Sequence, residues 1–129
     1  MVTVPSSLDP ICEIGTADGI CRAVVGPAQA SRIRQCYEDW ACACVLGEFR
    51  KALLIGRSDS DAFTHLAARD AIASMVLAGV PGDFRLAVVA LSANLIAVYD
   101  AVIVEANRRG LQSRRFLNEQ EAVKWLHAG

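Results

Sequence analysis

Cysteines are the side chains of this chain whose number and spacing most suggest chemistry. The 129 residues include five cysteines, and Cys42 and Cys44 lie only two positions apart. A chelating or redox pair needs both thiols on one side, but residues two apart on a helix point to different sides. An odd set of cysteines in apolar periodic positions is typical of reduced, buried thiols. We therefore expect five free thiols and no metal or other cofactor.

Histidines and aspartates are the next candidates for catalysis. His127 lies near the C-terminus, and His65, with Asp61 and Arg69 four residues away on either side, has the spacing of a solvated helix surface. Asp70 falls within an apolar helical arc, so it is either a functional carboxylate or a boundary residue bonded to a neighbouring cation. No nucleophile elbow and no glycine-rich phosphate loop follows a strand. The sequence predicts a non-enzyme with Asp70 as its weak functional candidate.

Charge and hydropathy exclude several classes of partner. The net charge is -1 and no basic block exists, so no nucleic-acid binding is predicted. The N-terminus lacks the pattern of a signal peptide, and the apolar stretch 86–104 divides into a strand and an amphipathic helix. We expect a cytoplasmic protein without membrane insertion. Because 53% of the residues are hydrophobic, we also expect a partner to cover some apolar surface.

Apolar runs and helical periodicities alternate along the chain, so strands and helices alternate too. The continuous run 84–91 is typical of a strand covered on both faces. Asn118 and Glu121 form a capping-box pattern that opens a last helix over 119–127. Strands are predicted at 11–15, 20–25, 50–55, 84–91 and 113–117. Helices are predicted from Gly26-Pro27 to Gly47, from Asp61 to Ala78, from Ser92 or Asn94 to Gly110, and over 119–127.

The first two strands are expected to form a hairpin around a four-residue turn at 16–19. This turn would place Ile14 opposite Cys21 and would pair Glu13 with Arg22. One face of the hairpin would then carry Cys12, Ile14, Cys21 and Ala23. Parallel pairing follows for the later strands, because each is joined to the next through a helix. The fold class is therefore α/β: a single-domain mixed five-stranded sheet with four helices, in the order β-β-α-β-α-β-α-β-α.

The helix predicted over 61–78 has two apolar arcs on nearly opposite sides. The first arc consists of Ala62, Phe63, Leu66, Ala73, Val76 and Leu77. The second consists of Ala68, Ile72 and Met75. Only one arc can face the sheet, and we expect the first to do so. The second arc is then the candidate interface with another copy of the chain or a partner protein, together with the apolar residues on the far face of the hairpin, Ile11, Ile20 and Val24.

Three segments of the chain resemble the STAS-like family, the bacterial group similar to the sporulation anti-sigma-factor antagonist and to lipid-binding SEC14-type domains. These segments are FRLAVV at 84–89, NRRG at 107–110 and RFLNEQEAVKWL at 115–126. The most specific piece is the A-x-x-W-L ending, Ala122 to Leu126. The resemblance covers the last third of the chain and agrees with the element order of the rest. It implies one STAS-like domain over 11–129, and the two prolines and two serines of residues 1–10 predict a flexible lead-in before it.

The resemblance implies a small cytosolic domain that binds proteins or apolar ligands without catalysis. Anti-sigma-factor antagonists carry Asp-Ser-Ser-Gly before a helix, with the second serine phosphorylated. Here the loop reads Asp59-Ser60-Asp61-Ala62, so the resemblance does not extend to kinase control at Asp61. Ser58 and Ser60 remain candidate phosphoacceptors in this regulatory loop, or they are simply helix caps. Two functions are open: a self-associating interaction domain, or a carrier of a small apolar ligand or lipid held between helices and sheet.

Overall fold

The computed structural model describes residues 12–25, 30–57, 62–81 and 83–128. Within these ranges, the side chains of Cys12, 30–33, 62–68 and Asn94 are not described. The strands are β1 (Cys12–Ala17), β2 (Ile20–Val25), β3 (Lys51–Gly56), β4 (Arg85–Ala90) and β5 (Gln112–Phe116). The helices are α1 (Ala30–Leu46), α2 (Ala62–Leu77), α3 (Ala93–Arg108) and α4 (Glu119–Ala128). This order confirms the predicted α/β class. The expected lead-in at 1–10 lies outside the described residues.

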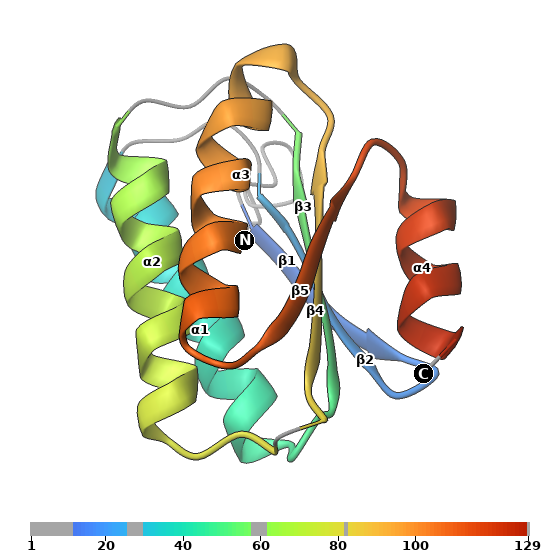
Figure 1. Ribbon diagram of the computed structural model, residues 1–129. Coiled ribbons are helices and arrows are strands. Elements are labelled where there is room, and N and C mark those ends of the chain that lie inside the picture. The colour runs from blue at the N-terminus through green and yellow to red at the C-terminus, as the bar shows by residue number, and fades with distance from the viewer. Residues whose placement is uncertain (1–11, 26–29, 58–61, 82, 129) are drawn as a thin grey trace, which may run out of the picture.

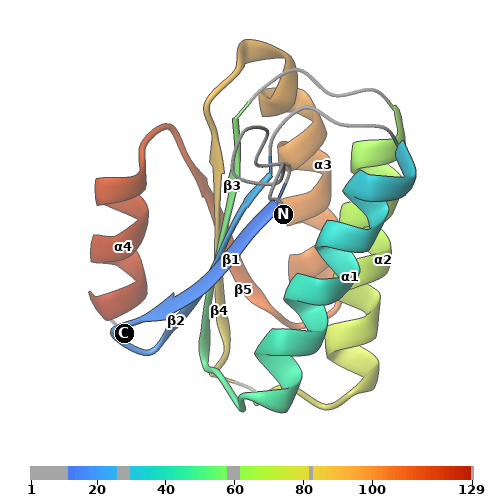
Figure 2. The same ribbon diagram turned by 180° about the vertical axis from the view of Figure 1, so that it is seen from behind.

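The strands lie in the sheet in the same order as in the sequence, β1-β2-β3-β4-β5. β1 is antiparallel to β2, and the following pairs are all parallel. Helices α1, α2 and α3 cover one face of this mixed sheet, and α4 covers the other (Figures 1 and 2). Because the strands are parallel, the C-terminal ends of α1 and α2 meet at the edge of the sheet where strands β3 and β4 begin.

The β1–β2 hairpin turns on two residues, Asp18 and Gly19, and not on four. Both have positive φ, 54° and 77°, as in the tight turns that favour Asp-Gly. The register therefore moves by two residues, and Ile14 lies opposite Ala23 while Cys21 lies opposite Thr16. The expected pairings of Ile14 with Cys21 and of Glu13 with Arg22 are wrong. A shift of two residues does not exchange the faces of a strand, so the expected division into two faces remains correct.

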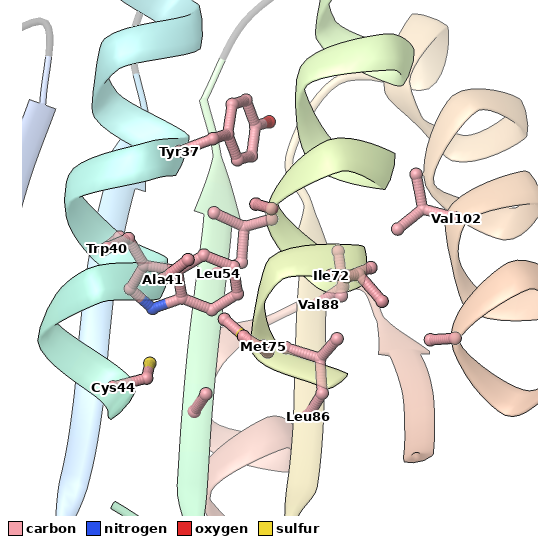
Figure 3. Close-up of a cluster of buried hydrophobic side chains, with 14 of the residues drawn as sticks. Tyr37, Trp40, Ala41, Cys44, Leu54, Ile72, Met75, Leu86, Val88 and Val102 are labelled. Carbon is pink, nitrogen blue, oxygen red and sulfur yellow. The ribbon is translucent and has the colours of Figure 1, made fainter. Parts of the chain in front are cut away.

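Two hydrophobic cores lie on the two faces of the sheet. The larger core lies under α1, α2 and α3, and Figure 3 shows part of it, including Trp40, Leu54 and Val88. The smaller core lies under α4, where Ala122 and Leu126 are fully buried. Alternate residues of the buried strands β3 and β4 supply the two cores in turn. Both faces of these strands are thus covered, as the continuous apolar runs predicted.

Helix α2 faces the sheet with the arc that we expected to face a partner. Ile72 is 1% exposed and Met75 is 0% exposed, and both side chains pack over the sheet (Figure 3). Leu77 of the other arc is 86% exposed. The assignment of the two arcs was therefore reversed. The physical reason is Asp70, because turning the first arc inward would bury this carboxylate in an apolar core.

Helix α4 covers the β2 half of the far face of the hairpin, which we expected to remain apolar and exposed. Ile20 and Val24 are buried in the same core as Leu126. The β2 half of that face is therefore not a free interaction surface, whereas Glu13, Gly15 and Ala17 of β1 are exposed and Ile11 lies outside the described residues. The start of α4 is as predicted, since the Asn118 side-chain oxygen accepts a hydrogen bond from the Glu121 backbone N–H at 2.9 Å.

Candidate functional site

The residues predicted to form a site are not brought together by the fold. Ile72 and Met75 are in the core, and nothing is described of the Ala68 side chain, although Ala68 lies within α2. The prediction that Ala68, Ile72 and Met75 form an interface is therefore wrong for Ile72 and Met75, whose side chains are buried in the core. The regulatory loop of Ser58, Asp59, Ser60 and Asp61 lies outside the described residues.

Asp70 lies on the outer surface between α1 and α2. Its carboxylate accepts a hydrogen bond from Arg34 at 2.9 Å, and more than a third of each of the two side chains is exposed. The Asp70 backbone carbonyl accepts a second bond from the Ser74 hydroxyl at 3.0 Å. This is the boundary residue bonded to a neighbouring cation that the sequence left as one of two alternatives. Such an exposed ion pair contributes about 0–1 kcal/mol to stability.

The ends of α1 and α2 carry the most exposed large apolar side chains of the described chain. Leu77 is 86% exposed and Leu46 is 76% exposed. Between these helix ends is an open groove of about 260 Å³. Its apolar lining consists of Val45, Phe49, Ala78, Val80 and Pro81. We call Leu46, Leu77 and these five lining residues the helix-end patch.

Charged side chains of both signs border the helix-end patch. Glu48 and Arg50 line the groove, and Arg50 donates two hydrogen bonds of 2.6 Å to the Asp83 carboxylate. Arg34 and Asp70 lie further along the same two helices. The surface thus combines an apolar centre with a rim of mixed charge, which is the composition of a protein interface.

A buried tyrosine pair lies beneath the opposite ends of the helices. The hydroxyls of Tyr37 in α1 and Tyr99 in α3 are 2.8 Å apart, and both side chains are almost fully buried (Figure 3 shows Tyr37). The Tyr99 hydroxyl can occupy this position only because residue 56 is a glycine, since a β-carbon at Gly56 would lie 2.5 Å from that hydroxyl. Burial raises the pKa of Tyr99 to about 12 and that of Tyr37 well above its ordinary value. The two phenols therefore stay neutral near pH 7 and serve the packing.

The cysteines differ from the expectation of five free thiols. Cys36 is in a disulfide, and its partner is not among the described side chains. Cys21, Cys42 and Cys44 are free. Cys42 is exposed and Cys44 is buried, so the prediction that these two point to different sides is confirmed. The expectation of five free thiols is therefore wrong for Cys36.

A second open surface lies beside α4. The Phe116 and Trp125 rings are 5.7 Å apart, and the Arg85 guanidinium lies 4.8 Å from the centre of the Trp125 ring. Trp125 is thus partly buried, and Leu126 next to it is the fully buried anchor of the helix. At the start of α4, Glu119 accepts hydrogen bonds of 2.7 and 3.0 Å from Arg22, which lower the pKa of Glu119. These contacts fix α4 to the sheet.

The described ranges contain neither a metal-binding cluster nor a membrane-spanning helix. Among those residues, no three histidine, cysteine, aspartate or glutamate side chains are placed so that they could share a metal ion. No helix in the same ranges is both long and apolar enough to cross a bilayer.

The fold and surfaces define a class of protein: a small α/β domain whose mixed sheet carries three helices on one face and one on the other. No protein-family model, no curated protein and no solved structure matches this chain.

Sequence reasoning missed Leu46 and Leu77 as surface residues. The signal that could have found Leu77 was Asp70, a charge within the first arc that marks this side of α2 as outward.

Proposed function

We propose that this chain is a non-catalytic cytoplasmic interaction domain of the STAS-like type, which associates with a second copy through the helix-end patch. The observation that carries the proposal is the exposure of Leu77 and Leu46 on adjacent helix ends beside an apolar groove. Exposing a leucine side chain to water costs about 1.5–3 kcal/mol relative to burying it. Covering both side chains would therefore contribute several kcal/mol to association, before the entropic costs of binding.

A second copy is the occupant that the charges favour. Across a two-fold axis the same patch meets itself, so each charge must find its opposite within that patch. The rim of the patch carries both signs, since Glu48 and Arg50 line the groove and Asp83 is the ion-pair partner of Arg50. The net charge of -1 adds no strong repulsion between two copies.

Charge substitutions at matched exposed leucines test this interface. Leu77→Glu should give a folded monomer, because it places a charge at the centre of the patch without touching the core. Leu117→Glu is the matched control, since Leu117 is 62% exposed but lies between β5 and α4. Light scattering should report a dimer for wild type and for Leu117→Glu, and circular dichroism should show that all three are folded.

Two results would contradict the proposed interface. A wild-type protein that is monomeric at high micromolar concentration excludes self-association of useful strength. Equal dissociation of both leucine variants would show a non-specific effect of added charge. Ile72→Glu should unfold the protein instead of dissociating it, because Ile72 is in the core.

The STAS-like assignment rests on the C-terminal sequence pattern, and the observed element order is compatible with it. Carriage of a small apolar ligand or lipid is the second candidate function. The groove at the helix ends favours it, since Val45, Phe49 and Val80 are among its lining residues. However, about 260 Å³ is slightly below the usual range for ligand pockets. Native mass spectrometry of protein from its own host separates the two functions, because it reports a dimer and a retained ligand as different masses.

A further inference from the structure

A pair of buried thiols lies where α1 packs on β2. The Trp40 indole N–H donates a 3.2 Å hydrogen bond to the Cys21 backbone carbonyl, which fixes α1 over this point of the strand. Cys44 follows Trp40 by four residues and therefore lies on the same helix face (Figure 3). Cys21 and Cys44 belong to the same core and are both 0% exposed.

The two thiols interact directly. A hydrogen bond between them lowers the pKa of Cys21 and raises that of Cys44. The two sulfurs are therefore within hydrogen-bonding reach of each other inside the core. A thiolate with a neighbouring thiol is the arrangement needed for disulfide formation.

The groove at the helix ends reaches Cys44, the helical member of this pair. Cys44 is one of its lining residues, although the cysteine itself has no surface open to bulk water. A groove of about 260 Å³ admits a molecule as small as hydrogen peroxide. The only other described free thiol, Cys42, is exposed and lies apart from the pair.

We propose that Cys21 and Cys44 form a peroxide-oxidisable dithiol that closes to a disulfide between β2 and α1. One sulfur of the pair, as its thiolate, attacks one oxygen of hydrogen peroxide, the O–O bond breaks, and this sulfur becomes a sulfenic acid while the second oxygen leaves as water after taking a proton. The other thiol gives its proton to the sulfenic oxygen and attacks the sulfenic sulfur, the S–O bond breaks, and that oxygen leaves as the second water. Two thiols are oxidised to one disulfide, and one hydrogen peroxide is reduced to two waters.

Peptide mapping of the full chain tests the proposal. The background is Cys42→Ser, which removes the exposed thiol and leaves Cys44 as the sole cysteine between Glu38 and Glu48. The folded protein is treated with hydrogen peroxide, quenched with catalase, denatured and alkylated. Cleavage after glutamate and arginine separates Cys21 from both Cys12 and Cys36, because Glu13 lies before Cys21 and Arg22 lies directly after it.

The expected result is a peptide containing Cys21 joined to a peptide containing Cys44, with two fewer alkylated thiols than in the untreated sample. The same treatment in urea should yield much less of this product, because unfolding separates the pair. Full alkylation of both cysteines after peroxide overturns the proposal. So does separate oxidation of each sulfur to sulfinic acid, or equal yield of the linked peptide from folded and unfolded chains.

Discussion

The tyrosine pair offers the sharpest energetic prediction. Tyr37→Phe or Tyr99→Phe removes one hydroxyl from a buried 2.8 Å hydrogen bond and leaves the other without that partner. A buried polar group left unsatisfied costs about 1–3 kcal/mol. Each single variant should therefore lower the free energy of unfolding by about 2 kcal/mol. The double variant removes both hydroxyls and leaves neither unsatisfied. Its loss in the free energy of unfolding should therefore be at least about 1 kcal/mol smaller than the sum of the two single losses, which is about 4 kcal/mol.

Urea unfolding at pH 7, followed by circular dichroism, supplies the three free-energy differences. The denaturant slope must stay constant among the variants, since a changed slope would indicate a different native or denatured state. Additivity within about 0.5 kcal/mol would refute the reasoning, because it would mean that the two hydroxyls do not interact.

The pair also predicts a loss of stability in alkali. Burial raises the pKa of Tyr99 from 10.0 to about 12. The unfolded chain then releases the tyrosine proton at lower pH than the folded chain does. The stability attached to Tyr99 is fully present below about pH 10 and is lost as the pH rises through about 12. Tyr99→Phe should flatten this decline, and an unchanged pH profile would contradict it.

Three further predictions concern the two cores and the start of α4. Ile72→Ala should destabilise the protein by about 3 kcal/mol in urea unfolding, whereas Leu77→Ala should change stability by less than about 0.5 kcal/mol; the opposite order would restore the original arc assignment. Leu126→Ala should cost about 3 kcal/mol, and a surface-like value would mean that α4 does not cover the sheet. Hydrogen bonding from Arg22 lowers the pKa of Glu119 below its ordinary value of 4.5. The ion pair therefore stabilises the folded protein above about pH 4.5, and this stabilisation is lost as the pH falls through the lowered pKa. Glu119→Gln should therefore make the free energy of unfolding less dependent on pH between pH 7 and pH 3. Because the pair is so exposed, the difference should be at most about 1 kcal/mol in unfolding curves measured over this range.

Local patterns in the sequence were enough to predict the order and kind of the elements. The run 84–91 and the strand–helix alternation predicted a mixed five-stranded sheet, because continuous apolar strands require cover on both faces. Local signals also placed helix ends, such as Asn118 at the start of α4 and Gly110, with φ of 94°, after α3. The Asp18-Gly19 pair was also a local signal, for a two-residue turn. Interpreting it as part of a four-residue turn misplaced the predicted hairpin register by two residues.

Tertiary structure alone decided which surfaces are covered. Helix α2 is apolar on two sides, so its rotation depends on the neighbours against which it packs, and the pattern of one helix does not contain that information. The β2 half of the far face of the hairpin is covered by Leu126, about a hundred residues later in the chain. Cys21 and Cys44 likewise meet only because Trp40 fixes α1 over β2. Such contacts join residues distant in sequence, and their partners are chosen by how the assembled layers pack, so local periodicity could not predict them.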